Sequence, residues 1–302
     1  MLSKSLNNLF SLHGKTALVT GGSRGLGLQM ARALGEAGAS VMLSSRKDDD
    51  LEAATTELKG LGINASWVSG NCSEEQDIKR IVDKTLNKFD GKLDILVNNA
   101  GATWGANTED HPVDAFDKVM DLNIRGYFLL SKEVGKRAMI PQKSGKIINI
   151  SSIAGLGGNP KGLNMIAYNT SKGAVINFTK TLGGEWGVHN INVNAICPGF
   201  FPTKMTRATL RKLGVDNMTQ RVPLCRLGDD DDMKGVTLLF ASDAGKHLTG
   251  QWSGCDQLFC LLAEYCILLY SLLLFVYYCR STYCGRWRRF HHFWLNSSVV
   301  LA

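Results

Sequence analysis

The chain reads Thr16-Ala17-Leu18-Val19-Thr20-Gly21-Gly22-Ser23-Arg24-Gly25-Leu26-Gly27 near its N-terminus, an apolar run followed at once by a glycine-rich loop. The apolar run predicts a buried strand, and the loop opens into a stretch with helical periodicity. Glycines at such a turn let backbone N–H groups and the helix N-terminus approach a pyrophosphate closely. A turn also uses glycine for its geometry alone, but the context favours a nucleotide site. The residues expected to hold the nucleotide here are Gly21, Ser23, Arg24, Gly25, Leu26 and Gly27.

The same alternation of strand and helix continues along the chain. Strands are expected at residues 16–20, 40–43, 65–68, 93–97, 146–150 and 191–196, and helices near 26–37, 74–89, 112–139, 166–187 and 229–242. Ser73 and Gln76 have the spacing of a capping box, and the aspartates at 48–50 and 229–232 are interpreted as solvated helix starts. Repeated strand–helix units predict an α/β fold with one doubly wound parallel sheet (Rossmann fold). We expect a single domain over residues 1–254, with ligands outside the carboxyl ends of the strands.

Composition limits the class of protein. Of 302 residues, 44% are hydrophobic and 20% are charged, which excludes disorder and collagen-like repetition. The net charge of +7 is scattered and does not form the clustered stripe that a nucleic-acid site needs. Only Cys72, Cys197 and Cys225 precede residue 255, without a CxxC pair or a secretory signal. This part is therefore expected to be cytoplasmic, with reduced thiols and no metal.

The end of the second expected strand bears on the choice of cofactor. It reads Ser44-Ser45-Arg46, with no carboxylate where an acidic residue would bind the two ribose hydroxyls of NAD. An arginine there suits a 2′-phosphate, and Arg24 can add a second positive charge. The pattern favours NADP(H), bound in part by Ser45 and Arg46. The alternative is that Arg46 only faces solvent.

Two further side chains have the spacing of a catalytic pair. Tyr168 and Lys172 are four residues apart on an expected helix, so the phenol and the ammonium lie on one face. A free phenol, with a pKa of about 10, is a poor base at neutral pH. An adjacent ammonium favours the phenolate and is expected to lower the pKa of Tyr168 toward the working range. Alone, this spacing is common by chance.

Here the pair occurs with other motifs, and residues 12–252 resemble the short-chain dehydrogenase/reductase family. The resemblance rests on Thr20-Gly21 through Gly27, Asn98-Asn99-Ala100-Gly101, Asn123, Ser151-Ser152, Tyr168 with Lys172, and Pro198-Gly199. It implies an enzyme that transfers hydride reversibly between a nicotinamide and a ketone or secondary alcohol. Among members, the chain is most similar to 3-oxoacyl reductases, and sugar-acid dehydrogenases such as gluconate 5-dehydrogenase are the alternative.

The resemblance also implies roles for individual residues. Tyr168 exchanges the proton with the substrate oxygen and Ser152 hydrogen-bonds that oxygen. Lys172 holds the nicotinamide ribose and lowers the phenol pKa, and Asn123 anchors a water in the proton relay. The cofactor residues that it adds are Asn71, Cys72, Asn98, Asn99, Ala100 and Gly101 near the adenosine, and Pro198, Gly199 and Thr203 near the carboxamide.

The sequence departs from the family pattern at three points before the C-terminus. Ser151 competes with Ser152 for the substrate oxygen, and Ser152 is preferred because the family serine usually precedes Val or Ile, here Ile153. The stretch from Ser152 to Tyr168 is a few residues longer than usual, which enlarges a loop over the substrate. Asn71 stands where the family usually has Asp, and an amide can still accept a hydrogen bond. Candidates for lining the substrate pocket are Trp104, Met165 and Phe200.

Composition changes abruptly after Gly254, since residues 255–302 hold five of the eight cysteines and four arginines but no lysine. Family members continue from Gln251 into a seventh strand ending Val-Asp-Gly-Gly, which is not found here, so we expect that strand to be lost or replaced. Codons for Cys284-Gly285-Arg286-Trp287 can read Val-Asp-Gly-Gly in another frame. We interpret residues from about 252 onward as translated from a retained intervening sequence or a frameshifted gene.

Other interpretations of this tail stay open. Residues 258–278 are apolar apart from Glu264 and could insert as a membrane anchor, although the arginines after them would put the nucleotide domain on the non-cytosolic side. Tail cysteines with His291 and His292 could bind a metal. Loss of the seventh strand would expose the sixth and remove a surface that this family uses for tetramers, leaving a catalytically impaired nucleotide-binding product. The expected partners are a small-molecule carbonyl or alcohol and, by the resemblance, further copies of the chain, but no nucleic acid.

Overall fold

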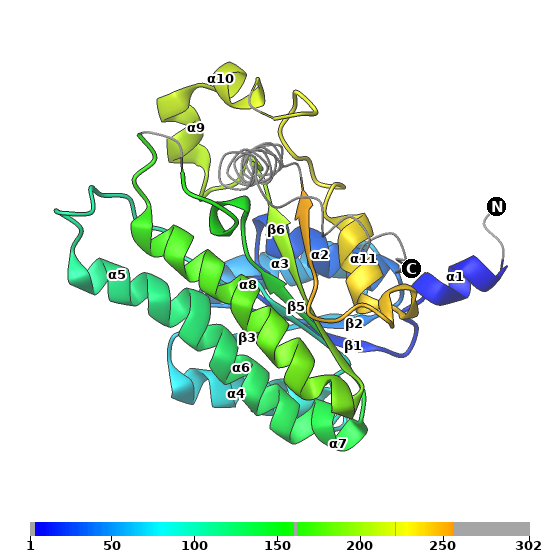
Figure 1. Ribbon diagram of the computed structural model, residues 1–302. Helices are drawn as coiled ribbons and strands as arrows, with labels where there is room; N and C mark the ends of the chain where they lie inside the picture. Colours follow the sequence, from blue (N-terminus) through cyan, green and yellow to red (C-terminus); the bar gives the residue numbers. More distant parts are fainter. Residues whose placement is uncertain (1–3, 160–161, 221, 256–302) are drawn as a thin grey trace, which may run out of the picture. The chain divides into compact units, whose positions relative to one another are not determined.

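The computed structural model describes residues 4–159, 162–220 and 222–255. Its centre is a sheet of seven parallel strands in the order β3-β2-β1-β4-β5-β6-β7 (Figure 1). The strands are β1 (Thr16–Thr20), β2 (Ser40–Ser45), β3 (Ala65–Ser69), β4 (Ile95–Asn98), β5 (Gly145–Ile150), β6 (Ile191–Pro198) and β7 (Trp252–Cys255). The order reverses between β1 and β4, as in doubly wound folds, so the predicted fold class is confirmed.

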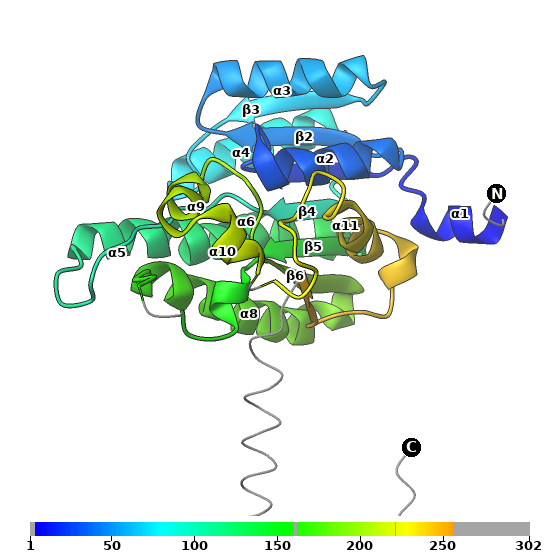
Figure 2. The ribbon, with the colours of Figure 1, turned by 90° about the horizontal axis from the view of Figure 1, so that it is seen from above.

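Helices cover both faces of the sheet (Figure 2). One face packs against α2 (Gly25–Glu36), α3 (Asp48–Gly60) and α11 (Lys234–Ala241), and the other against α4 (Glu75–Lys88), α6 (Gly126–Val134) and α8 (Ile166–Trp186). Alternate strand residues point to the two faces: Ala17 and Val19 belong to the first apolar cluster, and Leu18 to the second. Burial on both faces explains why the strands read as continuous apolar runs.

The helical stretch predicted at 112–139 is a single rod with two wider turns. Its parts are α5 (Val113–Met120), a π-helical turn (Asp121–Arg125), α6, a second π-helical turn (Gly135–Met139) and α7 (Ile140–Gln142). Such π-bulges are frequent at functional sites. The first one carries Asn123.

The prediction that the seventh strand is lost or replaced is wrong. β7 pairs in parallel with β6 in the register Ala195↔Trp252 to Pro198↔Cys255. Parallel pairing uses backbone N–H and C=O groups, which any extended residue except proline supplies, so the absence of the family's usual sequence does not remove the strand. Because β7 covers this edge of β6, the expectation that β6 is exposed is wrong. The expectation of a catalytically impaired product rested on that exposure and loses its support.

One predicted helix start and one predicted capping box are also wrong. α11 begins at Lys234 and not near Asp229, because Asp232 accepts hydrogen bonds from the Asp229 amide and from Arg226 in a loop before the helix. The predicted capping box at Ser73 does not form. α4 begins at Glu75, and the Ser73 hydroxyl donates to Asn71 Oδ1 instead. The start of α3 at Asp48 is confirmed.

The sequence analysis did not predict three short helices: α1 (Lys4–Phe10), α9 (Arg207–Leu213) and α10 (Val215–Thr219). Figure 1 shows α9 and α10 beyond the arrowheads of β6 and β7, at the carboxyl edge of the sheet. No helix within the described ranges has the length and apolarity to span a bilayer. The candidate anchor at 258–278 and the tail cysteines from 260 onward lie outside those ranges.

Candidate active site

The glycine-rich loop between β1 and α2 has the conformation of a phosphate cradle. Gly21 and Gly25 adopt φ values of +63° and +54°, which disfavour residues with a side chain. A Cβ on Gly27 would lie 2.3 Å from the carbonyl oxygen of Gly21, so the helix packs against the loop too closely for any other residue. These positions use glycine for backbone approach, as predicted for a nucleotide loop.

The N-terminus of α2 opens onto this loop. Arg24 precedes the helix with extended backbone angles, and its side chain makes no capping hydrogen bond. The first-turn amides, which include those of Leu26 and Gly27, therefore have no side-chain acceptor at the helix start. Together with the dipole they suit an anion such as a pyrophosphate.

The end of β2 supplies the groups predicted for the adenosine ribose. The Ser45 hydroxyl is buried and has no hydrogen-bond partner among the described residues, which suits it to accept or donate to a bound ligand. Arg46 is exposed, and Arg24 Nη1 lies 3.3 Å from Asp50 Oδ2. Two arginines thus lie near the expected position of a 2′-phosphate, but one of them already has a carboxylate partner.

Asn71 and Cys72 follow β3 at the same edge. The Asn71 amide donates to Asp77 Oδ2 (2.7 Å), and its side-chain oxygen accepts from Ser73. The Cys72 thiol is buried in the second apolar cluster, and burial raises its pKa to about 12. The thiol therefore stays protonated at neutral pH and packs in the core.

The segment after β4 links the nucleotide loop to the catalytic groups. Asn99 Nδ2 donates to the carbonyl oxygens of Thr20 (2.9 Å) and Gly21 (3.2 Å), and the Ala100 amide donates to the Thr20 hydroxyl. A Cβ on Gly101 would lie 3.3 Å from Asn123 Oδ1, so the backbone of Gly101 runs close to that amide.

Asn98 belongs to the core and not to the site surface. It is fully buried, and its Nδ2 donates to Asn149 Oδ1 (2.9 Å) and to the Ser131 hydroxyl (3.1 Å). Asn149 in turn donates to Thr179 of α8. These bonds hold the Asn98 side chain in the sheet–helix interface, so the side chain does not reach the surface where the adenosine is expected.

Lys172 is buried one turn after Tyr168 on α8. Its Nζ donates to the carbonyl oxygen of Ile150 (2.7 Å) and lies 5.6 Å from the ring centroids of Tyr127 and Tyr168. Burial lowers the pKa of Lys172 to about 8. The end of β5 thus fixes the ammonium beside the phenol.

The pKa of Tyr168 shifts opposite to the prediction. Burial raises it above its ordinary value of 10, and the hydrogen bond with the Ser152 side chain opposes this only in part. The loss of solvent around the phenolate outweighs the neighbouring ammonium, whose charge Ile150 already stabilises. In this state Tyr168 holds its proton at neutral pH.

The two candidate serines after β5 have different neighbours. The Ser151 hydroxyl donates to the carbonyl oxygen of Lys172 (2.7 Å), which ties β5 to α8. Ser152 accepts a hydrogen bond from the Ala154 amide (3.1 Å) and bonds to Tyr168. This geometry supports Ser152 as the serine that meets the substrate oxygen.

Asn123 joins the site from the π-helical turn. Its Oδ1 accepts from the Ala102 amide (2.8 Å), and its Nδ2 donates to the Ala102 carbonyl (2.9 Å) and to the Ser171 hydroxyl (2.9 Å). Ser171 precedes Lys172, and a Cβ on Gly101 would lie 3.7 Å from Lys172 Nζ. The structure therefore brings Asn123, Ser152, Tyr168 and Lys172 to one region.

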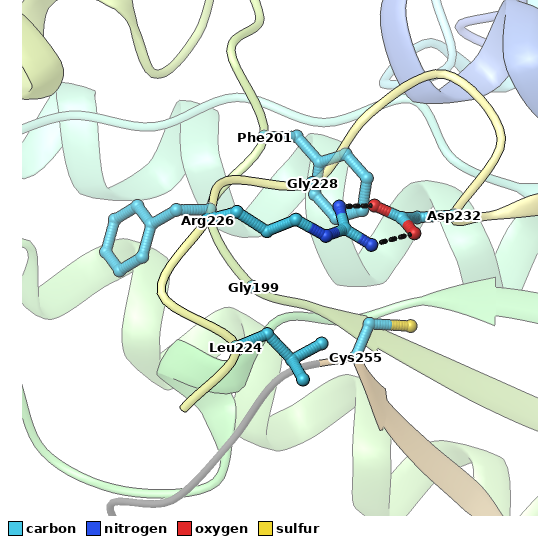
Figure 3. Close-up of a pocket in the computed structure, with 8 residues that line it drawn as sticks. Gly199, Phe201, Leu224, Arg226, Gly228, Asp232 and Cys255 are labelled. Carbon is cyan, nitrogen blue, oxygen red and sulfur yellow. Dashed lines mark hydrogen bonds and ion pairs between the residues drawn. The ribbon is translucent and has the colours of Figure 1, made fainter. Parts of the chain in front are cut away.

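A cavity of about 240 Å³ lies beyond the ends of β6 and β7 (Figure 3). Arg226 and Asp232 form an ion pair at one side, and Leu224 and Cys255 lie opposite. The remaining lining residues are Gly199, Phe200, Phe201 and Gly228. Gly199 and the adjoining Pro198 were predicted to contact the carboxamide. Thr203 comes close to the nucleotide loop, since its Cγ2 would lie 3.6 Å from a Cβ on Gly25.

Two loops meet on the substrate side of the site. The Ala106 amide donates to the carbonyl oxygen of Asn164 (3.0 Å), whose side chain donates to Asn107 Oδ1 (2.6 Å). Thr103 contacts the Met165 sulfur at 3.5 Å, and Trp104 is half exposed. Asn107, Asn164 and Arg226 were not predicted, because loop-to-loop hydrogen bonds leave no periodic signal in a sequence.

Among described residues, no three His, Cys, Asp or Glu side chains cluster as a metal site would require.

Comparison with known proteins agrees with this arrangement. A family model described as short chain dehydrogenase matches residues 15–214. A 3-oxoacyl-[acyl-carrier-protein] reductase from Synechocystis sp. is 37% identical over 248 residues, covering 82% of this chain and 97% of that protein. Two solved structures are similar along most of their length. A gluconate 5-dehydrogenase from Burkholderia cenocepacia in complex with NADP and tartrate has a TM-score of 0.78 at 31% identity, covering 83% of this chain and 97% of that one.

An NAD⁺-bound xylitol dehydrogenase has a TM-score of 0.77 at 33% identity, covering 81% of this chain and 98% of that one. The family model spans more than half of the chain, and the reductase from Synechocystis exceeds 30% identity over most of it. The glycine-rich loop and the Tyr168–Lys172 pair lie within the matched residues. The chain therefore belongs to the short-chain dehydrogenase family, whose members are oxidoreductases that act on CH–OH or C=O groups with a nicotinamide cofactor.

Proposed function

We propose that this enzyme is an NADP(H)-dependent reductase of 3-oxoacyl substrates. The observation that carries the proposal is the contact between Ser152 and Tyr168, with Lys172 buried one helical turn away. A substrate carbonyl oxygen bound there would meet a hydroxyl that donates a hydrogen bond and a phenol that donates a proton. Both groups stabilise the alkoxide as it develops.

Each residue of this group has a definite task. Tyr168 transfers its proton to the carbonyl oxygen, and Ser152 orients that oxygen. Lys172, held by Ile150, offers the charge that stabilises the phenolate left behind. Asn123 fixes Ala102 and Ser171 and so keeps the segment after β4 against α8. The bound nicotinamide supplies or accepts the hydride.

The protonation state of Tyr168 fits the role of proton donor in a reduction. Reduction of a ketone needs a protonated phenol at the start, whereas oxidation of an alcohol needs a base. Because burial keeps the pKa of Tyr168 above 10, the phenol is the dominant form at neutral pH. This state suits reduction.

The preference for NADP(H) is supported by charge. Arg46 is exposed at the end of β2 and has no ion-pair partner among the described residues, so its guanidinium can bind a 2′-phosphate. No carboxylate occupies the end of β2 itself, where it would favour the free ribose hydroxyls of NAD. Arg24 can contribute after it exchanges Asp50 for the phosphate.

The substrate side is largely apolar, which favours an acyl chain. Phe200, Phe201 and Leu224 line the cavity beyond β6, and Met165, before α8, contacts Thr103 in the loop after β4 that also carries Trp104. A hydroxylated sugar acid would need several hydrogen-bond partners in place of these side chains. The gluconate-type alternative is favoured by one observation, the amides of Asn107 and Asn164 at the rim.

The full chain should oxidise NADPH in the presence of a 3-oxoacyl thioester and should act on 5-ketogluconate more slowly. Tyr168→Phe should lose at least about 10³-fold in kcat while still binding NADPH, since only the proton donor is removed. Arg46→Ala should weaken NADPH binding more than NADH binding. Full activity of Tyr168→Phe, or a preference for 5-ketogluconate, would contradict the proposal.

A further inference from the structure

The Lys172 ammonium lies near two aromatic rings, and the proposed function uses only one of them. Tyr168 precedes Lys172 by one turn of α8, and Tyr127 reaches it from α6. Lys172 Nζ lies 5.6 Å from the ring centroid of each tyrosine. Tyr127 is only 1% exposed, so it cannot touch a substrate. Any part that Tyr127 has in turnover must act through a neighbouring residue.

The hydroxyl of Tyr127 shares a hydrogen-bond acceptor with Lys172. It donates to the carbonyl oxygen of Ile150 (3.2 Å), and Lys172 Nζ donates to the same oxygen (2.7 Å). A carbonyl oxygen has two lone pairs and can accept both bonds. Ile150 is the last residue of β5, so one backbone oxygen joins β5, α6 and α8. These bonds hold the ring of Tyr127 beside the ammonium.

The start of α6 places Tyr127 at this position. Tyr127 comes four residues after Asn123, which lies in the π-helical turn that leads into α6. Residues four apart lie on one side of a helix. Asn123 Nδ2 donates to the Ser171 hydroxyl (2.9 Å), and Ser171 precedes Lys172 in the chain. The same helical rod therefore contacts the Lys172 region at two successive turns.

The titratable groups around the ammonium are uncharged at neutral pH. Burial raises the pKa of Tyr127 well above its ordinary value and also raises the pKa of Tyr168. The other titratable neighbour of Lys172 among the described residues is the thiol of Cys197 on β6, and burial raises its pKa to about 11. None of these groups is a carboxylate that would neutralise the ammonium.

Burial works against the charge of Lys172, since it lowers the pKa of Lys172 to about 8. The groups that favour the charge are the carbonyl oxygen of Ile150 and the ring faces. An aromatic ring attracts a cation through the negative charge of its face, most strongly where water is excluded. Tyr127 is buried with Lys172, so its ring meets this condition.

We propose that Tyr127 is a positioning residue whose ring supports the Lys172 ammonium and keeps it charged beside Tyr168. Tyr127 takes no part in the chemical step and acts only through Lys172. The proposal rests on the proposed function in one respect, since it takes Lys172 to act in turnover as a cation. It adds a residue of α6 to the groups on which that reaction depends.

The test follows the pH dependence of turnover in variants of the full chain. Tyr127→Leu removes the ring, whereas Tyr127→Phe keeps the ring and removes the hydroxyl. Leu130→Ala is the matched control, because it also empties space on the buried side of α6. We would measure kcat/KM from about pH 6 to pH 10 at saturating NADPH. The substrates are the N-acetylcysteamine thioester of 3-oxobutanoate and, separately, 5-ketogluconate.

In the wild type, kcat/KM should fall above about pH 8, where Lys172 loses its proton. Tyr127→Leu should move this alkaline limb to lower pH by about one unit, since loss of the ring disfavours the cation. Tyr127→Phe should keep the wild-type limb, because its ring still faces the ammonium. Leu130→Ala should be less stable than the wild type but should keep the limb as well.

A second measurement needs no substrate. The free energy of unfolding is compared between each protein and its Lys172→Met counterpart, from neutral to alkaline pH. The cost of burying the charge is relieved as pH rises through the pKa of Lys172 in the folded state. In Tyr127→Leu this change should therefore begin about one pH unit lower than in the wild type.

The results separate the two proposals. An unchanged alkaline limb and an unchanged unfolding difference in Tyr127→Leu would show that Tyr127 only fills the core. An equal shift in Tyr127→Phe would assign the effect to the hydroxyl and overturn the role of the ring. If the wild type reduces only 5-ketogluconate, the proposed substrate is wrong but Tyr127 is still tested with that ketone. If it reduces neither substrate, the unfolding measurements decide the role of Tyr127.

Discussion

Arg24 Nη1 lies 3.3 Å from Asp50 Oδ2, so a guanidinium expected to bind the cofactor's 2′-phosphate already has a carboxylate partner. Asp50 belongs to the first turn of α3, which follows β2 and Arg46 after one intervening residue. A bound phosphate would have to replace or tolerate that carboxylate. The ion pair is about half exposed, which limits its strength.

Asp50→Asn should therefore tighten NADPH binding. It removes a negative charge beside Arg24 and should lower the Kd for NADPH by about two- to fivefold, in keeping with an exposed pair worth up to about 1 kcal/mol. The Kd for NADH should not change, because NADH has no 2′-phosphate. Fluorescence titration measures both constants. Asp49→Asn removes a charge from the same turn outside any described ion pair, and an equal gain there would contradict the role given to Arg24.

The buried Lys172 makes stability depend on pH. Its pKa is about 8 in the folded state and 10.5 when unperturbed, so between these values the unfolded chain binds the extra proton. Stability due to this group therefore rises with pH across that window, by about 3 kcal/mol at most, and the cost of burying the charge is fully present below pH 8.

Lys172→Met isolates this effect, since all other titrating groups cancel in the difference. Relative to the wild type, the variant should lose about 3 kcal/mol of stability between pH 7 and pH 10.5, as the wild type is relieved of its buried charge. Denaturant unfolding at the two pH values measures the change. Lys180→Met, at an exposed position on the same helix, should show no such trend. A flat difference for Lys172→Met would show that the ammonium is not buried.

The two serines after β5 should separate chemistry from stability. Ser152→Ala should lower kcat by about 10²-fold, the usual effect of removing one donor to a developing oxyanion. Ser151→Ala should reduce kcat only a few-fold but cost about 1 kcal/mol of stability, because the Lys172 carbonyl loses its partner. Steady-state kinetics and thermal unfolding of both variants test this. The reverse pattern would assign the catalytic role to Ser151.

The close packing at Gly27 predicts a specific effect of one methyl group. Gly27→Ala puts a Cβ 2.3 Å from the Gly21 carbonyl oxygen, so the loop must move, at a cost of about 1–3 kcal/mol and with loss of NADPH binding. Gly184→Ala in α8 is the control, because nothing lies within 4 Å of its added Cβ. The control should gain up to about 1 kcal/mol from helix propensity. Normal NADPH binding by Gly27→Ala would show that the loop is not a cradle.

Much of the fold could be predicted because its signals are local. β1, β3, β5 and β6 agree with the predicted ranges to within one or two residues, since a strand buried on both faces reads as an apolar run. The glycines at 21 and 25 have the positive φ values that a tight turn demands. Family motifs predicted Tyr168, Lys172, Ser152 and Asn123 as one group, and the structure places these four residues in one region.

The rest depends on burial and on particular side-chain contacts, which periodicity along the sequence does not reveal. The direction of the pKa shift at Tyr168 follows from burial, which spacing along a helix does not reveal. Ser73 donates to Asn71 instead of capping α4, and Asp232 binds Arg226 instead of starting α11. The turn of Asn98 into the core needed the positions of Asn149 and Ser131. Each of these choices is settled by a side-chain partner that the periodicity of helices and strands does not specify.

None of the four residues of β7 is buried, and the strand is held by main-chain pairing to β6. The strand at this edge of the sheet therefore places few constraints on its amino-acid sequence, and substitutions in it should have little effect on the fold. Ser152 follows β5, and Tyr168 and Lys172 lie on α8, so these candidate catalytic residues are on other elements than β7.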